Sequence, residues 1–375
     1  EKVEGLKHIW GRTDLIPLWV ADMDFATAPF VTDAIRKRCE NEVLGYTGKP
    51  DSYYNAIINW VKQRYDLIVT KEVINFVPGI VPGIGMAMNC FTQKGDKVMI
   101  QPPVYHPFAW VTTRNERTLV INPLRWENGM YRMDLDAFRE QIKGCKLFIL
   151  CNPHNPGGVV WTEAELRAIA DICYDEKVLV FSDEIHADLT LPPHTHRPFA
   201  TVSEKARMNS VTFMSPSKAF NMPGLSASHA LIFNEDLRKR FRIYMDAGEL
   251  DMGHVFAFLS VEAAYSHGTE WLDQCLAYIQ GNIDFVDEFL KKHAPKIKAI
   301  RPEASYLVWL DCRELELSQK DLNEFFVDKA HLALNDGEMF GKEGIGFMRL
   351  NVASPRCIIE KAMKQLADAY QLYIK

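Results

Sequence analysis

The sequence predicts an α/β fold: a three-layer α/β/α large domain around a mainly parallel sheet, and a smaller α+β domain made from both termini. Three observations predict this class. Apolar runs of strand length recur through the middle of the chain, and they are continuous, which is typical of strands buried on both faces. Helical patterns separate these runs. Nearer the C-terminus, long helical patterns accompany two further strand-like runs.

The strands expected in the large domain are short and apolar. In chain order they cover residues 97–101, 118–121, 146–151, 178–182, 210–214 and 227–233. A helix is expected after the third, because Thr162 and Glu165 have the spacing of a capping box and apolar residues follow at helical intervals from Leu166. This alternation of strand and helix predicts parallel strands joined by crossover helices.

The two ends of the chain differ from its middle. Residues 1–29 read as irregular, with aromatic and acidic side chains, whereas residues 305–310 and 347–350 read as strands of a second sheet. We therefore expect a large domain over residues 30–260 and a small domain over residues 1–29 and 261–375. The sequence has no repeat or charge-rich linker, so we expect a tight interface between them.

Composition narrows the function classes. The chain has 375 residues, 47% hydrophobic and 25% charged, the ordinary mix of a globular enzyme of two domains. A net charge of -6 without a basic tract argues against nucleic acid as a partner. No apolar stretch approaches the roughly 20 residues that cross a bilayer, and no signal peptide is visible. The eight scattered cysteines predict free thiols in a reducing cytoplasm. The chain starts at Glu1, so a missing natural N-terminus stays an open question.

Polar side chains follow two neighbouring strands. Asp183 ends one apolar run, and Ser215, Ser217 and Lys218 follow another. Open α/β sheets build their sites at the carboxyl ends of such strands. A lysine, a carboxylate and two hydroxyls are the parts that hold pyridoxal phosphate: the lysine forms a Schiff base, the acid faces the pyridine nitrogen and the hydroxyls bind phosphate.

Four further segments are weaker signals individually. A glycine-rich segment at residues 78–85 either offers helix-terminal amides to a phosphate or is a plain tight turn. Tyr105 either stacks on a ring or is a core aromatic, Asn155 either binds a ligand or caps a turn, and Arg349 either clamps a carboxylate or lies at the surface.

Three histidines, His186, His194 and His196, match no common zinc spacing, and we expect no metal.

The order of these segments is more specific than any one of them, and with it the chain resembles the fold-type I pyridoxal-phosphate enzymes, the aspartate aminotransferase superfamily. The resemblance runs from about Trp19 to Arg349. Within it, the chain is most similar to the bacterial C–S lyase branch of cystathionine β-lyases and cystalysin relatives. The segments that carry this resemblance are residues 18–25, 44–47, 182–188, 215–221 and 348–351.

The resemblance implies roles for individual residues. Lys218 would bear the cofactor and then transfer protons, Asp183 would keep the pyridine nitrogen protonated, Asn155 would bond the ring hydroxyl and Tyr105 would stack on the ring. Phosphate would be bound by Ser215, Ser217 and the amides of Ile80 and Val81. Tyr46 would reach the phosphate of a neighbouring subunit in an obligate homodimer, where it counts among the catalytic residues. Arg349 would bind the substrate carboxylate, with Tyr105 and Asn155 beside it.

Two positions depart from the aminotransferase pattern. Ser226 stands where many aminotransferases have a phosphate-binding arginine, and His186 stands where a tyrosine commonly bonds the ring hydroxyl. Both departures agree with the lyase branch. The resemblance therefore implies a β-C–S lyase that converts cystathionine or other L-cysteine S-conjugates to thiol, pyruvate and ammonia. An aminotransferase is the alternative.

Overall fold

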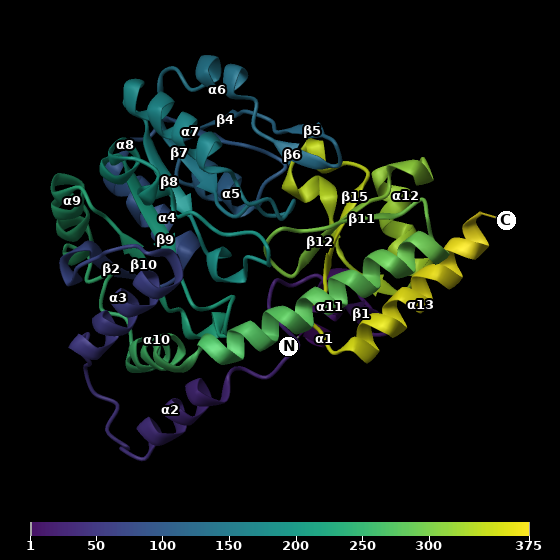
Figure 1. Cartoon of the computed structure of the whole chain (residues 1–375), viewed down its shortest axis with the longest axis horizontal. Helices are drawn as coiled ribbons and strands as arrows, with labels where there is room; N and C mark the ends of the chain where they lie inside the picture. The colour runs from purple at the N-terminus through teal and green to yellow at the C-terminus, as the bar shows by residue number, and fades with distance from the viewer. Residues whose placement is uncertain (1, 375) are drawn as a thin grey trace.

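The computed structural model describes residues 2–374 and contains a large and a small sheet (Figure 1). The large sheet has seven strands in the order β2-β10-β9-β8-β7-β3-β4. Their bounds are Ile74–Val77 (β2), Lys97–Ile100 (β3), Thr118–Ile121 (β4), Cys145–Cys151 (β7), Leu179–Asp183 (β8), Ser210–Met214 (β9) and Ser228–Leu231 (β10). All six predicted strands are present within a few residues of their expected ends.

The sheet is mainly parallel, as predicted. Neighbouring strands from β4 to β9 run parallel, whereas β10 runs antiparallel to both β9 and β2. The antiparallel strand was not anticipated, because a fully buried strand is apolar in either direction. The carboxyl ends of β7, β8 and β9 therefore lie at one edge, and the polar residues that follow them meet there.

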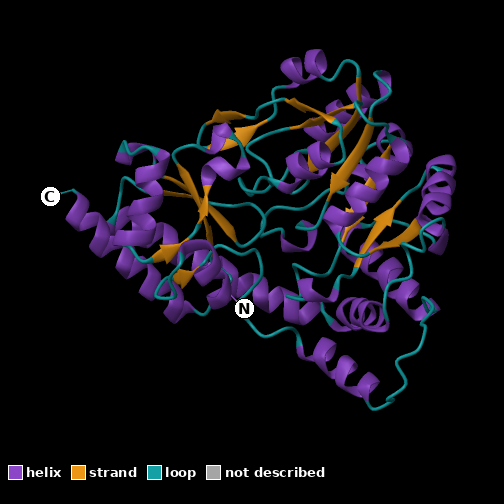
Figure 2. Ribbon diagram, turned by 180° about the vertical axis from the view of Figure 1, so that it is seen from behind, coloured by secondary structure: helices purple, strands orange, loops and turns teal. Residues whose placement is uncertain are grey.

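Helices cover both faces of this sheet, which confirms the three-layer prediction (Figures 1 and 2). Val180 and Phe181 are neighbours on β8 yet belong to different hydrophobic clusters, because successive side chains of a strand point to opposite faces. Helices α6 (Leu135–Gln141), α7 (Glu163–Asp175) and α8 (Glu204–Met208) contribute to the cluster with Val180. The cluster with Phe181 includes α4 (Ile80–Phe91), α5 (Pro107–Arg114) and α9 (Glu235–Asp246).

The predicted capping box begins α7. Thr162 Oγ accepts the amide of Glu165 at 3.2 Å, and the Glu165 carboxylate accepts the amide of Thr162 at 2.8 Å. Two amides that have no partner within the helix are thereby satisfied.

The smaller sheet is antiparallel, in the order β11-β12-β15-β14. It consists of Lys298–Ile300 (β11), Leu307–Asp311 (β12), Asn335–Asp336 (β14) and Phe347–Asn351 (β15). The long helix α11 (Thr269–His293) packs along α13 (Arg356–Tyr373) beside this sheet (Figure 1). Shorter elements are α12 (Gln319–Glu324), β13 (Leu332–Ala333) and a hairpin of β5 (Arg125–Glu127) and β6 (Met130–Arg132).

The N-terminal region differs from expectation. Residues 1–29 were predicted to be irregular, but α1 (Lys2–Trp10) is helical and β1 (Ile16–Pro17) pairs with β13. Only Leu6 of α1 is buried, so this short helix has too little apolar periodicity to be recognised in the sequence. Glu1 lies outside the described residues.

Residues 29–65 also contain helices that the sequence pattern did not reveal. Helices α2 (Pro29–Cys39) and α3 (Asp51–Tyr65) both pack against α10 (Val255–His267). The domain boundaries themselves stay a prediction. Within residues 2–374, no helix is long and apolar enough to span a membrane.

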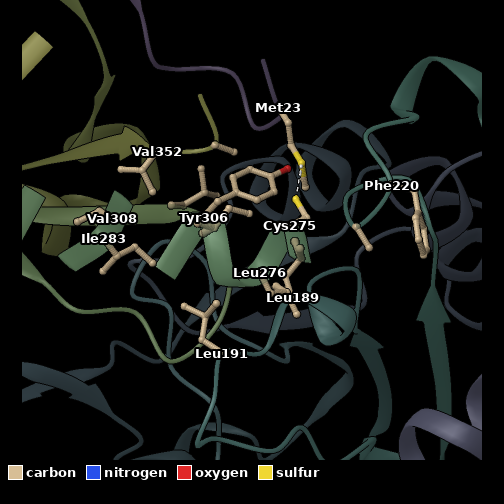
Figure 3. Packing of buried hydrophobic residues seen from close by; sticks show 14 of the residues in the cluster. Met23, Leu189, Leu191, Phe220, Cys275, Leu276, Ile283, Tyr306, Val308 and Val352 are labelled. Atoms are coloured by element: carbon tan, nitrogen blue, oxygen red, sulfur yellow. Dashed lines mark hydrogen bonds between the residues drawn. The ribbon is translucent and has the colours of Figure 1, made fainter. Parts of the chain in front are cut away.

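One hydrophobic cluster continues from these helices to the small sheet. Figure 3 shows part of it, with Tyr306, which directly precedes β12 of the small sheet, packed near Met23 and Cys275. The segment around Met23 is thereby held between α11 and the carboxyl edge of the large sheet.

Candidate active site

A cavity of about 200 Å³ lies at the carboxyl edge of the large sheet. Eight of the predicted site residues line it: Ile80, Val81, Tyr105, Asn155, Asp183, His186, Ser217 and Lys218. These residues come from separate strand ends, loops and the start of α4, far apart in the sequence. The mainly parallel sheet brings them together at one edge. Larger hollows exist elsewhere on the chain, but this one gathers the buried titratable groups.

Lys218 occupies the loop after β9. Its Nζ donates to the carbonyl oxygen of Ala21 at 2.5 Å, and the same oxygen accepts the Tyr306 hydroxyl at 3.0 Å. Burial and, to a smaller extent, the positive charge of Arg349 lower the Lys218 pKa to about 8, while Asp22 and Asp183 oppose the shift. A neutral amine is therefore populated near neutral pH, which a nucleophilic lysine requires.

We expect the reactivity of Lys218 to follow this pKa. Below pH 8, the rate at which an amine-specific reagent modifies Lys218 in cofactor-free protein should rise about tenfold per pH unit, and it should level off above pH 8. The direction follows because burial disfavours the charged form. Peptide mapping at several pH values measures it, with exposed Lys94 as the internal comparison. A profile for Lys218 that still rises steeply beyond pH 10 would contradict the lowered pKa.

Asp183 is the last residue of β8 and is buried. Its Oδ1 accepts the amide of Ile185 at 3.1 Å. Burial raises the pKa of Asp183 to about 7, and the negative charge of Glu184 contributes to this rise. A carboxyl group in this position favours a cationic partner, since a nearby positive charge restores its ionised form.

The N-terminus of α4 also lines the cavity. The first amides of this helix, at Ile80 and Val81, have no carbonyl four residues earlier within the helix, and both residues line the cavity. Gly79 precedes them at φ 151°, a conformation that favours glycine. These amides suit an anion such as phosphate.

The two predicted serines have different positions. Ser217 lines the cavity, and Ser215 Oγ accepts the Ser217 amide at 3.1 Å and lies 2.8 Å from the carbonyl oxygen of Ala227. The two hydroxyl oxygens are 2.9 Å apart. Ser215 thus orients the loop that carries Ser217. Ser226, at the position of the missing arginine, adopts a left-handed conformation with φ 48°.

Arg349 lies in β15 and is buried, so the alternative that it is a surface arginine is wrong. Its Nη1 donates to Asn155 Oδ1 at 3.0 Å, and Nη2 donates to Asn335 Oδ1 at 2.5 Å and to the Trp19 carbonyl at 3.2 Å. Burial lowers its pKa to about 10.

Among the residues that the structure describes, no carboxylate forms an ion pair with Arg349. Among residues 2–374, its hydrogen-bond partners are neutral, and its Nε has no partner. A buried guanidinium of this kind is suited to an incoming carboxylate. Asn335 was missed in the sequence, because it lies in a two-residue strand that leaves no pattern.

Two aromatic rings complete the cavity. Tyr105 lines it beside α5, and burial raises the pKa of its hydroxyl. His186 also lines it, and burial together with the charge of Lys218 lowers the His186 pKa to about 3. His186 is therefore neutral at physiological pH, with its Nδ1 lacking a partner among the described residues.

Tyr46 is not brought into this cavity. It lies between α2 and α3, in a segment without helix or strand, and its side chain is 99% exposed (Figure 1). A single chain therefore leaves Tyr46 without contact to the other predicted site residues.

Sequence reasoning used residues 18–25 for the family resemblance but assigned no site residue in this segment, from which Ala21 lines the cavity. Ala21 contributes a backbone carbonyl, which no side-chain motif can reveal. Asn221 holds this segment in place: its Oδ1 accepts the Met23 amide at 2.9 Å, and its Nδ2 donates to the carbonyl oxygens of Met23 and Phe25. The N-terminal segment is thus tied to the loop that carries Lys218.

Known proteins share this architecture over nearly its whole length. Cystathionine beta-lyase PatB of Bacillus subtilis is 38% identical over 96% of this chain and 94% of its own, and Protein MalY of Escherichia coli is 30% identical over 96% and 93%. The crystal structure of cystalysin from Treponema denticola, which contains a pyridoxal 5'-phosphate cofactor, has a TM-score of 0.96 and 33% identity. It covers 100% of this chain and 96% of that one.

The family model described as aminotransferase class I and II matches residues 13–366. This range includes both sheets and every residue that lines the cavity. The match agrees with the motif order and with the geometry of the cavity, and the chain therefore belongs to the aminotransferase class I and II family, within the fold-type I pyridoxal-phosphate superfamily.

Proposed function

We propose that this protein is a pyridoxal-phosphate-dependent β-C–S lyase acting on cystathionine or related L-cysteine S-conjugates. The observation that carries the proposal is the cavity that Lys218 and Asp183 line together, beside the uncompensated charge of Arg349. The names of the relatives at 30–38% identity, cystathionine beta-lyase among them, support the lyase over the aminotransferase.

The residues fit the cofactor at each of its polar ends. Asp183 needs a cationic partner, the free amides of α4 and Ser217 need an anion, and Lys218 has a pKa low enough to react with an aldehyde. Asn155 and His186 line the same cavity and could bond a ring hydroxyl, and Tyr105 is available for stacking. When bound, the cofactor supplies a cationic ring that accepts the electron pair left on the substrate Cα.

The chain then performs three tasks. Arg349 binds the substrate carboxylate, and its hydrogen bond to Asn155 sets the orientation of that carboxylate relative to the ring. Lys218, as a free amine, would remove the Cα proton, and its lowered pKa makes it a base near neutral pH. Asp183 keeps the ring nitrogen protonated, so that the ring retains its positive charge. The electron pair left at Cα would expel a thiolate from Cβ, and the 2-aminoacrylate set free would react with water to give pyruvate and ammonia.

The same residues would serve a lyase and an aminotransferase, so the two activities must be distinguished by their products. The purified protein should release pyruvate and ammonia from L-cystathionine in equal amounts without an added 2-oxo acid. Formation of a new amino acid only when a 2-oxo acid is present would overturn the lyase and leave the cofactor assignment intact.

The role of Arg349 leads to a second prediction. Arg349→Ala should raise KM about 10- to 100-fold, which corresponds to the roughly 1.5–3 kcal/mol of a charged hydrogen-bonded contact. Arg349→Lys should recover only part of this loss, because an ammonium cannot form the planar fork. Steady-state kinetics measure it, with the partly exposed Arg313→Ala as the matched control. An unchanged KM in Arg349→Ala would remove its assigned role.

We also propose a homodimer in which Tyr46 enters the partner's cavity. The exposure of Tyr46 and of neighbouring Val43 and Leu44 (99%, 71% and 63%) supports this, because apolar side chains on a segment without helix or strand suit a protein partner. All eight cysteines are free, which supports a reducing, cytoplasmic location.

Subunit mixing tests the position of Tyr46. Tyr46→Ala and Lys218→Ala should each lose most activity, yet co-expression should recover about a quarter of the wild-type sites, because half of the dimers are hybrids with one intact site. Activity of purified hybrids measures it, and gel filtration of each single variant controls for dimer formation. Inactive hybrids would place Tyr46 in its own subunit's site, and an active Tyr46→Ala homodimer would place it outside any site.

A further inference from the structure

A buried acidic network adjoins the cavity at Asp183, and the proposed function uses no other member of it. Asp183 and Glu184 are consecutive, and both are buried. Asp183 lines the cavity, whereas the Glu184 carboxylate bonds residues outside the cavity lining. Two carboxylates side by side in the interior repel each other, and each one needs a partner.

Glu184 has three hydrogen-bond donors, which satisfy both of its oxygens. Its Oε1 accepts the Ser182 hydroxyl and the Phe199 amide, each at 2.8 Å, and its Oε2 lies 2.8 Å from His196 Nε2. With each oxygen accepting a donor, the arrangement suits an ionised carboxylate. His196 is the one ionisable side chain of the three donors.

His196 is itself enclosed. Its side chain is 1% exposed, and its ring meets the edge of Tyr65 with the centroids 5.5 Å apart. The Tyr65 hydroxyl donates to the buried carboxylate of Asp188, which also accepts Trp60 Nε1 at 3.0 Å. The ring therefore lies between two buried acids, Glu184 in direct contact and Asp188 through Tyr65.

We propose that His196 is a positioning residue that holds the Glu184 carboxylate and shares its charge, so that the neighbouring Asp183 remains available to the cofactor ring nitrogen. The inference rests on the role proposed for Asp183. Without His196, the charge of Glu184 would act on Asp183 uncompensated and favour its protonated form, which binds a cationic ring nitrogen less strongly. The ring would then be held less tightly and would be a weaker electron acceptor.

A double-mutant cycle on the holoenzyme tests this inference. His196→Leu should weaken cofactor binding about tenfold and lower kcat about tenfold, with KM within about twofold, comparable to the loss of an outer-shell partner at a metal site. His196→Gln, whose amide can still donate to Glu184, should remain near wild type. The double variant His196→Leu/Glu184→Gln should recover cofactor affinity, because the uncompensated charge is removed together with its partner.

His194→Leu is the matched control. His194 lies two residues away, its side chain is 40% exposed, and its Nδ1 is 3.7 Å from Glu303. Cofactor affinity is read from the absorbance and the cofactor content after dialysis, independently of turnover. If His196→Leu behaves like His194→Leu, or if the double variant is no better than His196→Leu, the proposal is overturned. If His196→Leu does not fold, the double variant must fold and bind cofactor, and its failure to do so overturns the proposal as well.

The cycle also separates this inference from the role of Asp183. If Asp183→Asn lowers kcat and His196→Leu changes neither kcat nor cofactor affinity, the proposed function stands and only the role of His196 is refuted. If neither substitution changes kcat or cofactor affinity, the role assigned to Asp183 is refuted as well.

Discussion

Lys218→Ala is expected to lower turnover by about 10⁴-fold or more, because it removes both the covalent attachment point and the base that takes the Cα proton. The fold should survive, because within residues 2–374 the Lys218 side chain forms one hydrogen bond, to the Ala21 carbonyl oxygen, and the Tyr306 hydroxyl still donates to that oxygen in the variant. Pyruvate release measures the loss.

Cofactor binding gives Lys218→Ala a second measurement. The variant should still take up pyridoxal phosphate, because Asp183, Asn155 and the amides of α4 remain in place. The bound cofactor should be removed by denaturation without any covalent link to the chain. Lys205→Ala, a surface lysine paired with Asp171 and Asp175, is the control and should retain full activity. Undiminished turnover in Lys218→Ala would refute the mechanism.

Asp183→Asn should lower kcat about 100- to 1000-fold, the size expected when one electrostatic partner of the reacting group is removed. Asparagine can keep the acceptor for the Ile185 amide, so the geometry is retained while the charge is lost. KM should change less than kcat, because Asp183 faces the ring rather than the substrate carboxylate. Asp175→Asn, which changes an exposed side chain at the end of α7, is the matched control. A kcat near wild type would show that the ring nitrogen has another partner.

The stability of cofactor-free Asp183→Asn gives an independent result. The Asp183 pKa is raised from 3.8 to about 7, so the folded state binds more protons than the unfolded state between these values. This contribution to stability is present at pH below 3.8 and is lost as pH rises through 7. The substitution removes the buried charge, so the variant should melt at a higher temperature than wild type at pH 7–8. A lower melting temperature there would contradict the raised pKa.

Local residue patterns were sufficient for most of the large domain. The apolar runs at β7, β8 and β9 predicted buried strands because each has no polar face, and the capping box at Thr162 predicted the start of α7 because its signal lies within four residues. Helix α1 and strand β1 were missed because they are short, and β1 forms only by pairing with β13, more than 300 residues later.

The sequence by itself determined the chemistry of the site. Lys218, Asp183 and the glycine loop before Ile80 each follow a buried strand, and in an open parallel sheet the ends of such strands meet at one edge. The kinds of side chain and their order were therefore enough to predict pyridoxal phosphate as the cofactor.

Only the tertiary structure decided the environment of these groups. The depth of burial that moves the pKa of Lys218 to about 8 and of Asp183 to about 7 depends on how the N-terminal segment closes over the cavity. The contacts of Arg349 with Asn155 and Asn335, and of Glu184 with His196, join residues from separate elements. Solvation and charge in a folded interior depend on distances between such residues, and a linear pattern carries no information about those distances.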